Sequence, residues 1–319
     1  MLCIILFAFF TRIWLLSHPS ETYFDEAYHV PAARLIAQND ERAYEWWHEP
    51  IAGDDYHDWL HPPFAKLAQA ASIRLLGDNS WGWRLPSVLM GTGLVFVVYL
   101  FVNQLFSQLH TKTTSKKIAL LAAGLVAIDG LPLVQSRIAM NDIFLSFFVI
   151  LALFAVSYWQ PKIWFFKIER LKDANWWLLL TGVFLGLGLA TKWSMLLLII
   201  FLLGLIFTAV IRTKSWRVLP LTFLCLVFLP LVIYLLSYSQ MFLQGKRITH
   251  FIELHQQIIW YQTHRDNDHL YHSSPTDWLL NRRPVWYWTD NSLLDDDRSD
   301  QQLTANIYAC LLYTSDAAD

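Results

Sequence analysis

The sequence predicts an all-α, polytopic membrane protein: a bundle of transmembrane helices with amphipathic loop helices on its outer face. Of the 319 residues, 55% are hydrophobic and 16% are charged, and the mean hydropathy is +0.34, outside the mix typical of soluble domains. The apolar residues fall in long blocks separated by short charged stretches, which indicates membrane spans. The net charge of −2 says little about partners, and we expect none that is a nucleic acid.

Seven apolar blocks are candidate spans, although several are shorter than the roughly 20 residues that a bilayer core requires. We therefore expect some helices to extend into neighbouring polar residues. No basic residue precedes the first block and no small-residue cleavage site follows it, which favours a span over a secretory signal peptide. The predicted spans are about 2–16, 85–106, 118–134, 143–158, 176–190, 194–211 and 218–239.

The short loops predict the orientation, because Lys and Arg in such loops stay on the cytoplasmic side. Three alternate loops are basic, and the connections between them, including the long loop 17–83, would face outward. We divide the chain into a seven-span catalytic region (1–239), an outer-face region rich in aromatic residues and His (240–309) and a non-native tail (310–319). The basic loops carry Lys112, Lys116 and Lys117; Lys162, Lys167, Arg170 and Lys172; and Arg212, Lys214 and Arg217.

The stretch "TYFDEAYHVPAARLIAQND" (22–40) places two adjacent carboxylates, Asp25 and Glu26, just beyond the outer end of the first span. There a carboxylate stays hydrated while it faces a substrate held in the lipid. Neighbouring residues of a helix point about 100° apart. We therefore expect one carboxylate to face the substrate and the other to face elsewhere.

The outer loop also contains "HPPFAKLAQAASIRLL". Proline fits the first turn of a helix, so Pro62–Pro63 predict an amphipathic helix that lies along the membrane surface. Lys66 is either part of its solvated face or a ligand beside His61, and Arg84 is either an interface anchor or a phosphate ligand. The apolar face of this helix would hold Phe64, Leu67, Ala68, Ala71 and Leu75.

Further ionisable residues lie at the outer ends of later spans. Arg137 and Asp142 form either an ion pair between two helices or part of a functional site, and Asp129 falls inside a predicted span. Lys192 follows a run of small residues that allows close helix contact, and it either snorkels or supplies charge. That run is Gly182, Gly186, Gly188 and Ala190.

Five motifs in order, "YFDEAYHVPAA", "HPPFAKL", "GWRLPSVLMG", "QSRIAMNDIFLSFF" and "GLGLATKWS", resemble the polyprenyl-phosphate-mannose protein mannosyltransferase family, which has the GT-C fold. A later stretch, "YQTHRDNDHLYHSSPTDWLLNRRPVWYW", resembles the outer loop after that family's seventh span. The resemblance implies inverting transfer of mannose or a similar hexose from a polyprenyl phosphate to Ser or Thr hydroxyls of proteins. It makes Asp25 the general base and Glu26 a supporting or acceptor-binding group, and it places Arg84 near the lipid phosphate.

Elementary chemistry agrees with these roles. An alcohol is a weak nucleophile, so a carboxylate must take its proton, and a departing phosphate needs fixed cations. As phosphate ligands we predict Arg84, Lys66, His61, Arg137 and Lys192. As further substrate contacts we predict His29, Asp142, Tyr261 and His264.

We assign no metal site and no certain cofactor, although a divalent cation near Asp25 stays possible. Cys3, Cys225 and Cys310 have no metal-like spacing. The expected location is the bacterial inner (plasma) membrane, with the site on the non-cytoplasmic face. The chain lacks the family's further spans, and the end "ACLLYTSDAAD" resembles translated adapter sequence, so we expect a truncated protein. Two alternatives stay open: a related transferase acting on lipid A or another glycan, and a membrane transporter.

Overall fold

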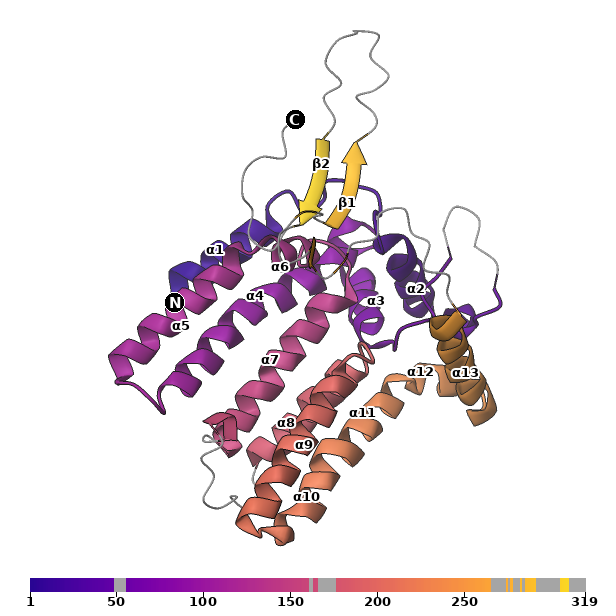
Figure 1. Ribbon diagram of the computed structural model, residues 1–319. Coiled ribbons are helices and arrows are strands. Elements are labelled where there is room, and N and C mark those ends of the chain that lie inside the picture. Colours follow the sequence, from indigo (N-terminus) through magenta and orange to yellow (C-terminus); the bar gives the residue numbers. More distant parts are fainter. Residues whose placement is uncertain are drawn as a thin grey trace.

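The computed structural model describes residues 1–48, 56–160, 163–165, 176–264, 274, 276–277, 282, 285–290 and 305–309. In this part of the chain the long helices lie side by side in one bundle, as predicted (Figure 1). Two antiparallel strands, β1 (Val285–Asp290) and β2 (Ala305–Ala309), form a small sheet that the sequence did not predict. The predicted tail 310–319 and most of the basic loop 160–175 lie outside the described residues.

Each predicted span overlaps at least one helix, although 118–134 is divided between α5 and α6 at Asp129, and the protein is an integral membrane protein. Four helical segments, α4, α7, α9 and the run Trp216–Ser237, are long and apolar enough to cross a membrane, while α1 and α8 are shorter apolar helices. The bounds are α1 (Leu2–Ile13), α4 (Ser80–Phe106), α5 (Lys112–Ile128), α7 (Asn141–Trp159), α8 (Trp176–Leu189), α9 (Met195–Thr213), and then α10 (Leu219–Phe223), a π-helical turn (Leu224–Phe228) and α11 (Leu229–Ser237).

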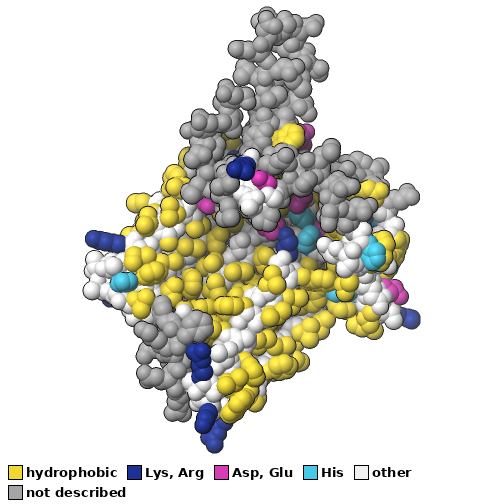
Figure 2. All heavy atoms as spheres, viewed as in Figure 1, with side chains coloured by type: hydrophobic (Ala, Val, Ile, Leu, Met, Phe, Trp, Pro, Cys, Tyr) yellow, Lys and Arg dark blue, Asp and Glu magenta, His cyan; other side chains and the backbone are white. Residues whose placement is uncertain are grey.

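The polar helices gather at one end of this bundle. There α2 (Glu26–Gln38), α3 (Phe64–Leu76) and α6 (Gly130–Gln135) lie near β1, while α12 (Ser239–Leu243) and α13 (Ile248–His264) follow the last long helix (Figure 1). The α4–α5 and α9–α10 connections, which carry the first and third basic clusters, lie at the opposite end. Figure 2 shows Asp, Glu and His side chains, with some Lys or Arg, at the polar end above an apolar bundle surface, and further Lys or Arg side chains at the opposite end.

Helix α3 begins where the two prolines predicted, but it buries a different face from the one expected. Ala71 and Leu75 are exposed, with Leu75 at 83%, while the buried residues are Ala65, Lys66, Gln69, Ala70, Ser72 and Ile73. Ile73 packs with residues of α2 and α4. Small side chains along α3 allow this close packing, so the predicted apolar stripe along a membrane surface is only partly formed.

One detail of the spans differs from the prediction and another agrees with it. Asp129 is not inside a span: α5 ends at Ile128, and the Asp129 carboxylate accepts a hydrogen bond from Leu131 N at 3.0 Å to cap α6. Gly182 and Gly186 on α8 allow close helix packing as predicted, because a Cβ atom on Gly182 would lie 1.9 Å from Cys225 O of the last membrane helix.

Helix α2 is held at its C-terminal end by side chains from two other elements. Arg74 of α3 donates to Ala37 O at 2.6 Å and to Ile36 O at 3.1 Å. Gln240 of α12 donates to Ile36 O at 3.0 Å. These bonds satisfy carbonyls that the end of a helix leaves without partners, so Arg74 and Gln240 hold this end of α2 against α3 and α12.

Candidate active site

The N-terminus of α2 gives its two adjacent carboxylates different surroundings. Asp25 is the capping residue, yet its carboxylate accepts no capping hydrogen bond, although aspartate commonly does so at this position. Glu26 is fully buried, whereas Asp25 keeps part of its surface exposed. The two side chains therefore have different surroundings, as the angular separation along a helix predicted.

Glu26 forms a buried bidentate ion pair with Arg84 of α4. Arg84 Nε donates to Glu26 Oε1 at 2.9 Å, and Nη2 donates to Oε2 at 2.8 Å. Ala139 N also donates to Glu26 Oε1 at 2.7 Å. The remaining Arg84 donors bond to backbone carbonyls of the segment between α1 and α2, namely those of Leu16 at 2.9 Å, Pro19 at 2.6 Å and Glu21 at 2.8 Å.

This geometry supports neither of the two interpretations of Arg84 from sequence. The side chain is 0% exposed, so the interface-anchor interpretation is wrong. All five N–H donors of a guanidinium have partners within the protein, which leaves none for an external phosphate in this conformation. The contacts instead fix the start of α2 against α4 and the preceding segment.

Asp58, in the loop before α3, organises three of the predicted ligands, although the sequence analysis did not single it out. His29 Nδ1 lies 3.0 Å from Asp58 Oδ2, and His61 Nδ1 lies 3.0 Å from Oδ1. Lys66 Nζ lies 3.2 Å from Oδ2. Burial raises the pKa of the Asp58 carboxyl, but Lys66 and the two histidines outweigh it and hold this pKa well below its ordinary value. Asp58 is therefore a buried carboxylate anion.

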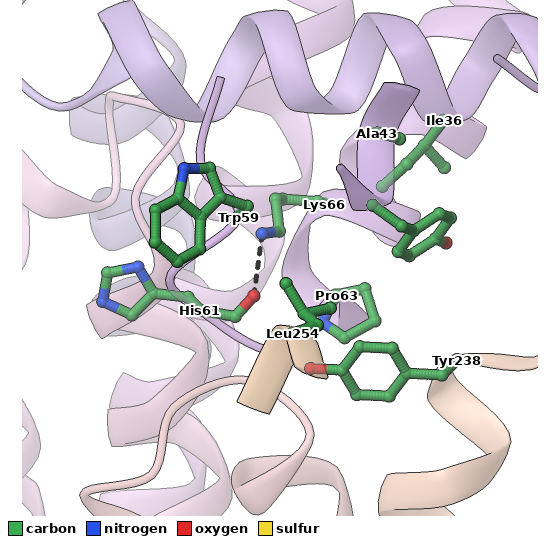
Figure 3. A pocket seen from close by; sticks show the side chains of 9 residues that line it. Ile36, Ala43, Trp59, His61, Pro63, Lys66, Tyr238 and Leu254 are labelled. Carbon is green, nitrogen blue, oxygen red and sulfur yellow. Dashed lines mark hydrogen bonds between the residues drawn. The ribbon is translucent and has the colours of Figure 1, made fainter. Parts of the chain in front are cut away.

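Lys66 is buried at 3% exposure, so its assignment to a solvated face is wrong. Besides Asp58, its ammonium donates to His61 O at 2.8 Å (Figure 3) and to Asp58 O at 2.5 Å. Burial lowers the pKa of Lys66, and Asp58 opposes that effect. These three bonds hold the 58–61 turn against α3, and they leave Lys66 no donor directed at a ligand.

Asp25 lies beside this cluster without a hydrogen bond from any described residue to its side chain. Burial raises the pKa of its carboxyl; the neighbouring His29 lowers it and Asp142 raises it. Tyr287 of β1 belongs to the same surroundings, since burial raises its pKa to about 12 with smaller contributions from Asp142 and Asp25. A partly exposed carboxylate with a raised pKa and no fixed partner has the properties of a general base.

The next predicted ligands lie in the α6–α7 turn, on α7 and in the α8–α9 turn. Lys192 Nζ lies 2.7 Å from Asp142 Oδ1, and both side chains are about 30% exposed, at 28% and 30%. Arg137 donates to backbone carbonyls at the end of α1, Thr11 O at 2.7 Å and Arg12 O at 3.3 Å. The predicted Arg137–Asp142 ion pair is therefore wrong, because each side chain has another partner.

The two predicted ligands on α13 are less central. The Tyr261 ring packs edge-on against Trp59 at 5.8 Å between centroids. Trp59 lines a small pocket with His61, Lys66 and Tyr238 (Figure 3), so Tyr261 reaches the cluster through that ring. His264 is exposed, and its described contacts are with Trp260 and Thr263 of its own helix. The structure does not bring His264 to Asp25.

Among the described residues, no group of three or more His, Cys, Asp or Glu side chains is arranged to hold a metal ion. Asp58 gathers two histidines, but it does so through their Nδ1 atoms and shares its carboxylate with Lys66. That arrangement is a hydrogen-bonded cluster with a cation already in place.

Arg12, near the end of α1, is a second buried polar residue that the sequence motifs did not indicate. It is buried and donates to Ser136 Oγ at 3.2 Å and to Ala127 O at 3.3 Å. A charged residue inside an apolar block was the available signal. The sequence feature that could have indicated Asp58 is its position three residues before His61, next to Pro62–Pro63.

The family model of dolichyl-phosphate-mannose-protein mannosyltransferase matches residues 2–243. A polyprenol-phosphate-mannose–protein mannosyltransferase of Corynebacterium glutamicum is 31% identical over 62% of this chain and 39% of its own length. One from Mycolicibacterium smegmatis is 26% identical over 88% of this chain and 62% of its own length. The chain thus spans less than two thirds of the length of these relatives.

A solved structure shares the fold. The yeast protein O-mannosyltransferase Pmt1-Pmt2 complex bound to the sugar donor matches with a TM-score of 0.57 and 20% identity, over 75% of this chain and 32% of that chain.

Proposed function

Because the chain belongs to the dolichyl-phosphate-mannose-protein mannosyltransferase family, we propose that it acts in the transfer of mannose from a polyprenyl-phosphate donor to Ser or Thr hydroxyls of proteins. The relatives that carry this activity in their names extend beyond the region matched here. The observation that carries the proposal is the contrast between two neighbours: the Asp25 side chain is partly exposed and accepts no hydrogen bond from a described residue, whereas the Glu26 carboxylate is held by Arg84.

In the proposed reaction the acceptor hydroxyl attacks the anomeric carbon from the face opposite the phosphate, and the carbon–phosphate-oxygen bond breaks with inversion. Asp25 takes the hydroxyl proton as the new bond forms, which is general-base catalysis. Burial supports this role, because it raises the pKa of the Asp25 carboxyl toward the working pH.

The departing phosphate gains negative charge that nearby cations can stabilise. We propose that the cations that stabilise this charge are Arg137 and Lys192. Lys192 keeps 28% of its side chain exposed, and Arg137 contacts backbone carbonyls without an anionic partner among the described residues. Arg84 and Lys66 are buried and saturated, so we assign them to holding α2 and the 58–61 turn. With these cations in place, we propose that no divalent cation is needed.

We further propose that the site faces the non-cytoplasmic side of a bacterial plasma membrane. The first and third basic clusters lie at the end of the bundle opposite α2 and α3 (Figure 1), and short basic loops stay on the cytoplasmic side.

The test is a transfer assay with the purified protein in lipid nanodiscs, polyprenyl-phosphate-mannose and a Ser/Thr peptide. We expect a hexose on the peptide, detected by mass spectrometry, and no product with lipid A as acceptor. Asp25→Asn should lower the rate by about 10³-fold or more while donor binding persists. A rate unchanged by a chelator would agree with metal-free chemistry. Wild-type rates in Asp25→Asn would remove Asp25 from the base role, and hexose transfer to lipid A in place of the peptide would reassign the acceptor.

A further inference from the structure

Asp58 determines which nitrogen of His29 and of His61 carries a proton. Its carboxylate is ionised, so it accepts hydrogen bonds and cannot donate them. Both imidazoles meet it through Nδ1, at 3.0 Å in each case. Each Nδ1 must therefore carry a proton, and in the neutral form of either ring the Nε2 atom is unprotonated.

These Nε2 atoms have no hydrogen-bond partner among the described residues. His29 lies four residues after Asp25, so the two side chains are neighbours on the same face of the helix start. The backbone N–H of His29 donates to Asp25 O at 3.0 Å, so the two residues are one helical turn apart at the start of α2. The ring of His61 meets that of His29 edge-on at 5.8 Å between centroids, and its side chain is 26% exposed.

The charged groups around His29 cancel in pairs. Lys66 balances Asp58 and Lys192 balances Asp142, at 3.2 Å and 2.7 Å. Burial raises the pKa of Tyr287 to about 12, which keeps it neutral. On the other side of Asp58, burial lowers the pKa of His57 to about 4, so it too is neutral at pH 7. Asp25, one turn before His29, has no ion pair with any described residue.

We propose that Asp58 is a positioning residue that holds His29 as the second proton acceptor behind Asp25, an inference that rests on the proposed function. The acceptor O–H bond breaks, and its proton passes to Asp25 as the sugar–oxygen bond forms. Asp25 then transfers the proton to His29 Nε2, which restores the carboxylate and makes an imidazolium whose Nδ1–H stays bonded to Asp58. The imidazolium releases the proton to solvent at the open edge beside His61.

The first test measures tautomers and does not depend on activity. In the full chain labelled with ¹⁵N-histidine, in nanodiscs at neutral pH, His29 and His61 should both be protonated at Nδ1. Asp58→Asn should change both signals, whereas the matched control Asp78→Asn, which removes an exposed partner of Arg34, should change neither. The signals are assigned with His29→Gln and His61→Gln. A ring protonated at Nε2 in the wild type, or signals unaltered by Asp58→Asn, would overturn the inference.

The second test covers the case in which Asp58→Asn fails to fold. His29→Gln keeps a side-chain amide but no proton acceptor of similar basicity. Its kcat should fall at least about 10-fold, a loss within the usual contribution of acid–base groups, with the donor KM within about twofold. Added imidazole buffer should raise kcat in this variant and leave the wild type unchanged. A kcat loss that imidazole does not alter would assign His29 a structural role. Absence of any transfer by the wild type would count against the proposed function, while the tautomer result stands independently.

Discussion

Two buried carboxylates lie at the start of α2: Glu26 belongs to its first turn, and Asp58 contacts His29. Each carboxylate accepts several hydrogen bonds. Glu26 binds Arg84 and Ala139 N; Asp58 binds His29, His61 and Lys66. The two regions differ in what the donors can do. A guanidinium does not lose its proton in proteins, whereas an imidazole exchanges one near neutral pH.

This difference separates geometry from chemistry. The Arg84 region fixes the position of α2 through the bidentate pair with Glu26 and the bonds to backbone carbonyls. The Asp58 region contains groups that can accept and release protons. Asp25 is adjacent to Glu26 and one turn before His29, and its carboxylate accepts no hydrogen bond from the described residues of either region.

The largest expected effect is on stability in the Arg84 region. Arg84→Met leaves Glu26 buried without its counter-ion, which should lower the free energy of unfolding by about 3–5 kcal/mol. The double variant Glu26→Met/Arg84→Met removes both charges and should recover part of that loss. Unfolding in mixed micelles, followed by tryptophan fluorescence, measures both. A double variant less stable than Arg84→Met would contradict this account.

Asp58→Asn should cost about 2–3 kcal/mol at pH 7, because Lys66 loses its buried counter-ion while the amide keeps some hydrogen bonds. The folded-state pKa of Asp58 is well below its ordinary value, so its stabilisation is present above about pH 4 and is lost as the pH falls through the folded-state pKa. The difference between the two proteins should therefore narrow in acid. A difference that grows in acid would show that the pKa shift has the opposite sign.

Lys192→Met should raise the donor KM about 10-fold, or about 1.4 kcal/mol, because the phosphate loses a partly exposed cation and Asp142 is left unpaired. Lys112→Met, at the start of α5 on the opposite end of the bundle, is the control and should leave KM unchanged. Equal effects of the two substitutions would point to net charge rather than to the site.

The smallest effect should have the opposite sign. Burial raises the pKa of Asp25, so the folded state loses stability as the pH rises from about 4 through the folded-state pKa and the carboxylate ionises. Asp25→Asn avoids this cost and should be more stable than the wild type at pH 7, by about 0.5–1 kcal/mol. The gain should vanish in acid. A variant destabilised at pH 7 would show that Asp25 has a stabilising partner.

Local sequence signals predicted much of this fold. Two prolines placed the start of α3 at Phe64, and the apolar blocks located the long helices. The adjacent pair Asp25 and Glu26 indicated different directions for the two side chains from helix geometry alone. These features depend on neighbours along the chain, which the sequence displays directly.

The unpredicted features depend on contacts between distant segments. The saturation of Arg84 requires carbonyls more than 60 residues away, such as those of Leu16 and Glu21. Asp58 meets His29 across 29 residues. The burial of Lys66 follows from the same cluster, because a lysine in the first turn of an amphipathic helix is ordinarily solvated.

Helix α2 is fastened at both ends, by Arg84 and Ala139 at its first turn and by Arg74 and Gln240 at its last. In the proposed reaction, a base at the start of this helix has little freedom to move toward a distant substrate. The proposed lipid-linked sugar and polypeptide acceptor would then have to approach it, and selectivity among acceptors would depend on which extended chains fit a fixed geometry.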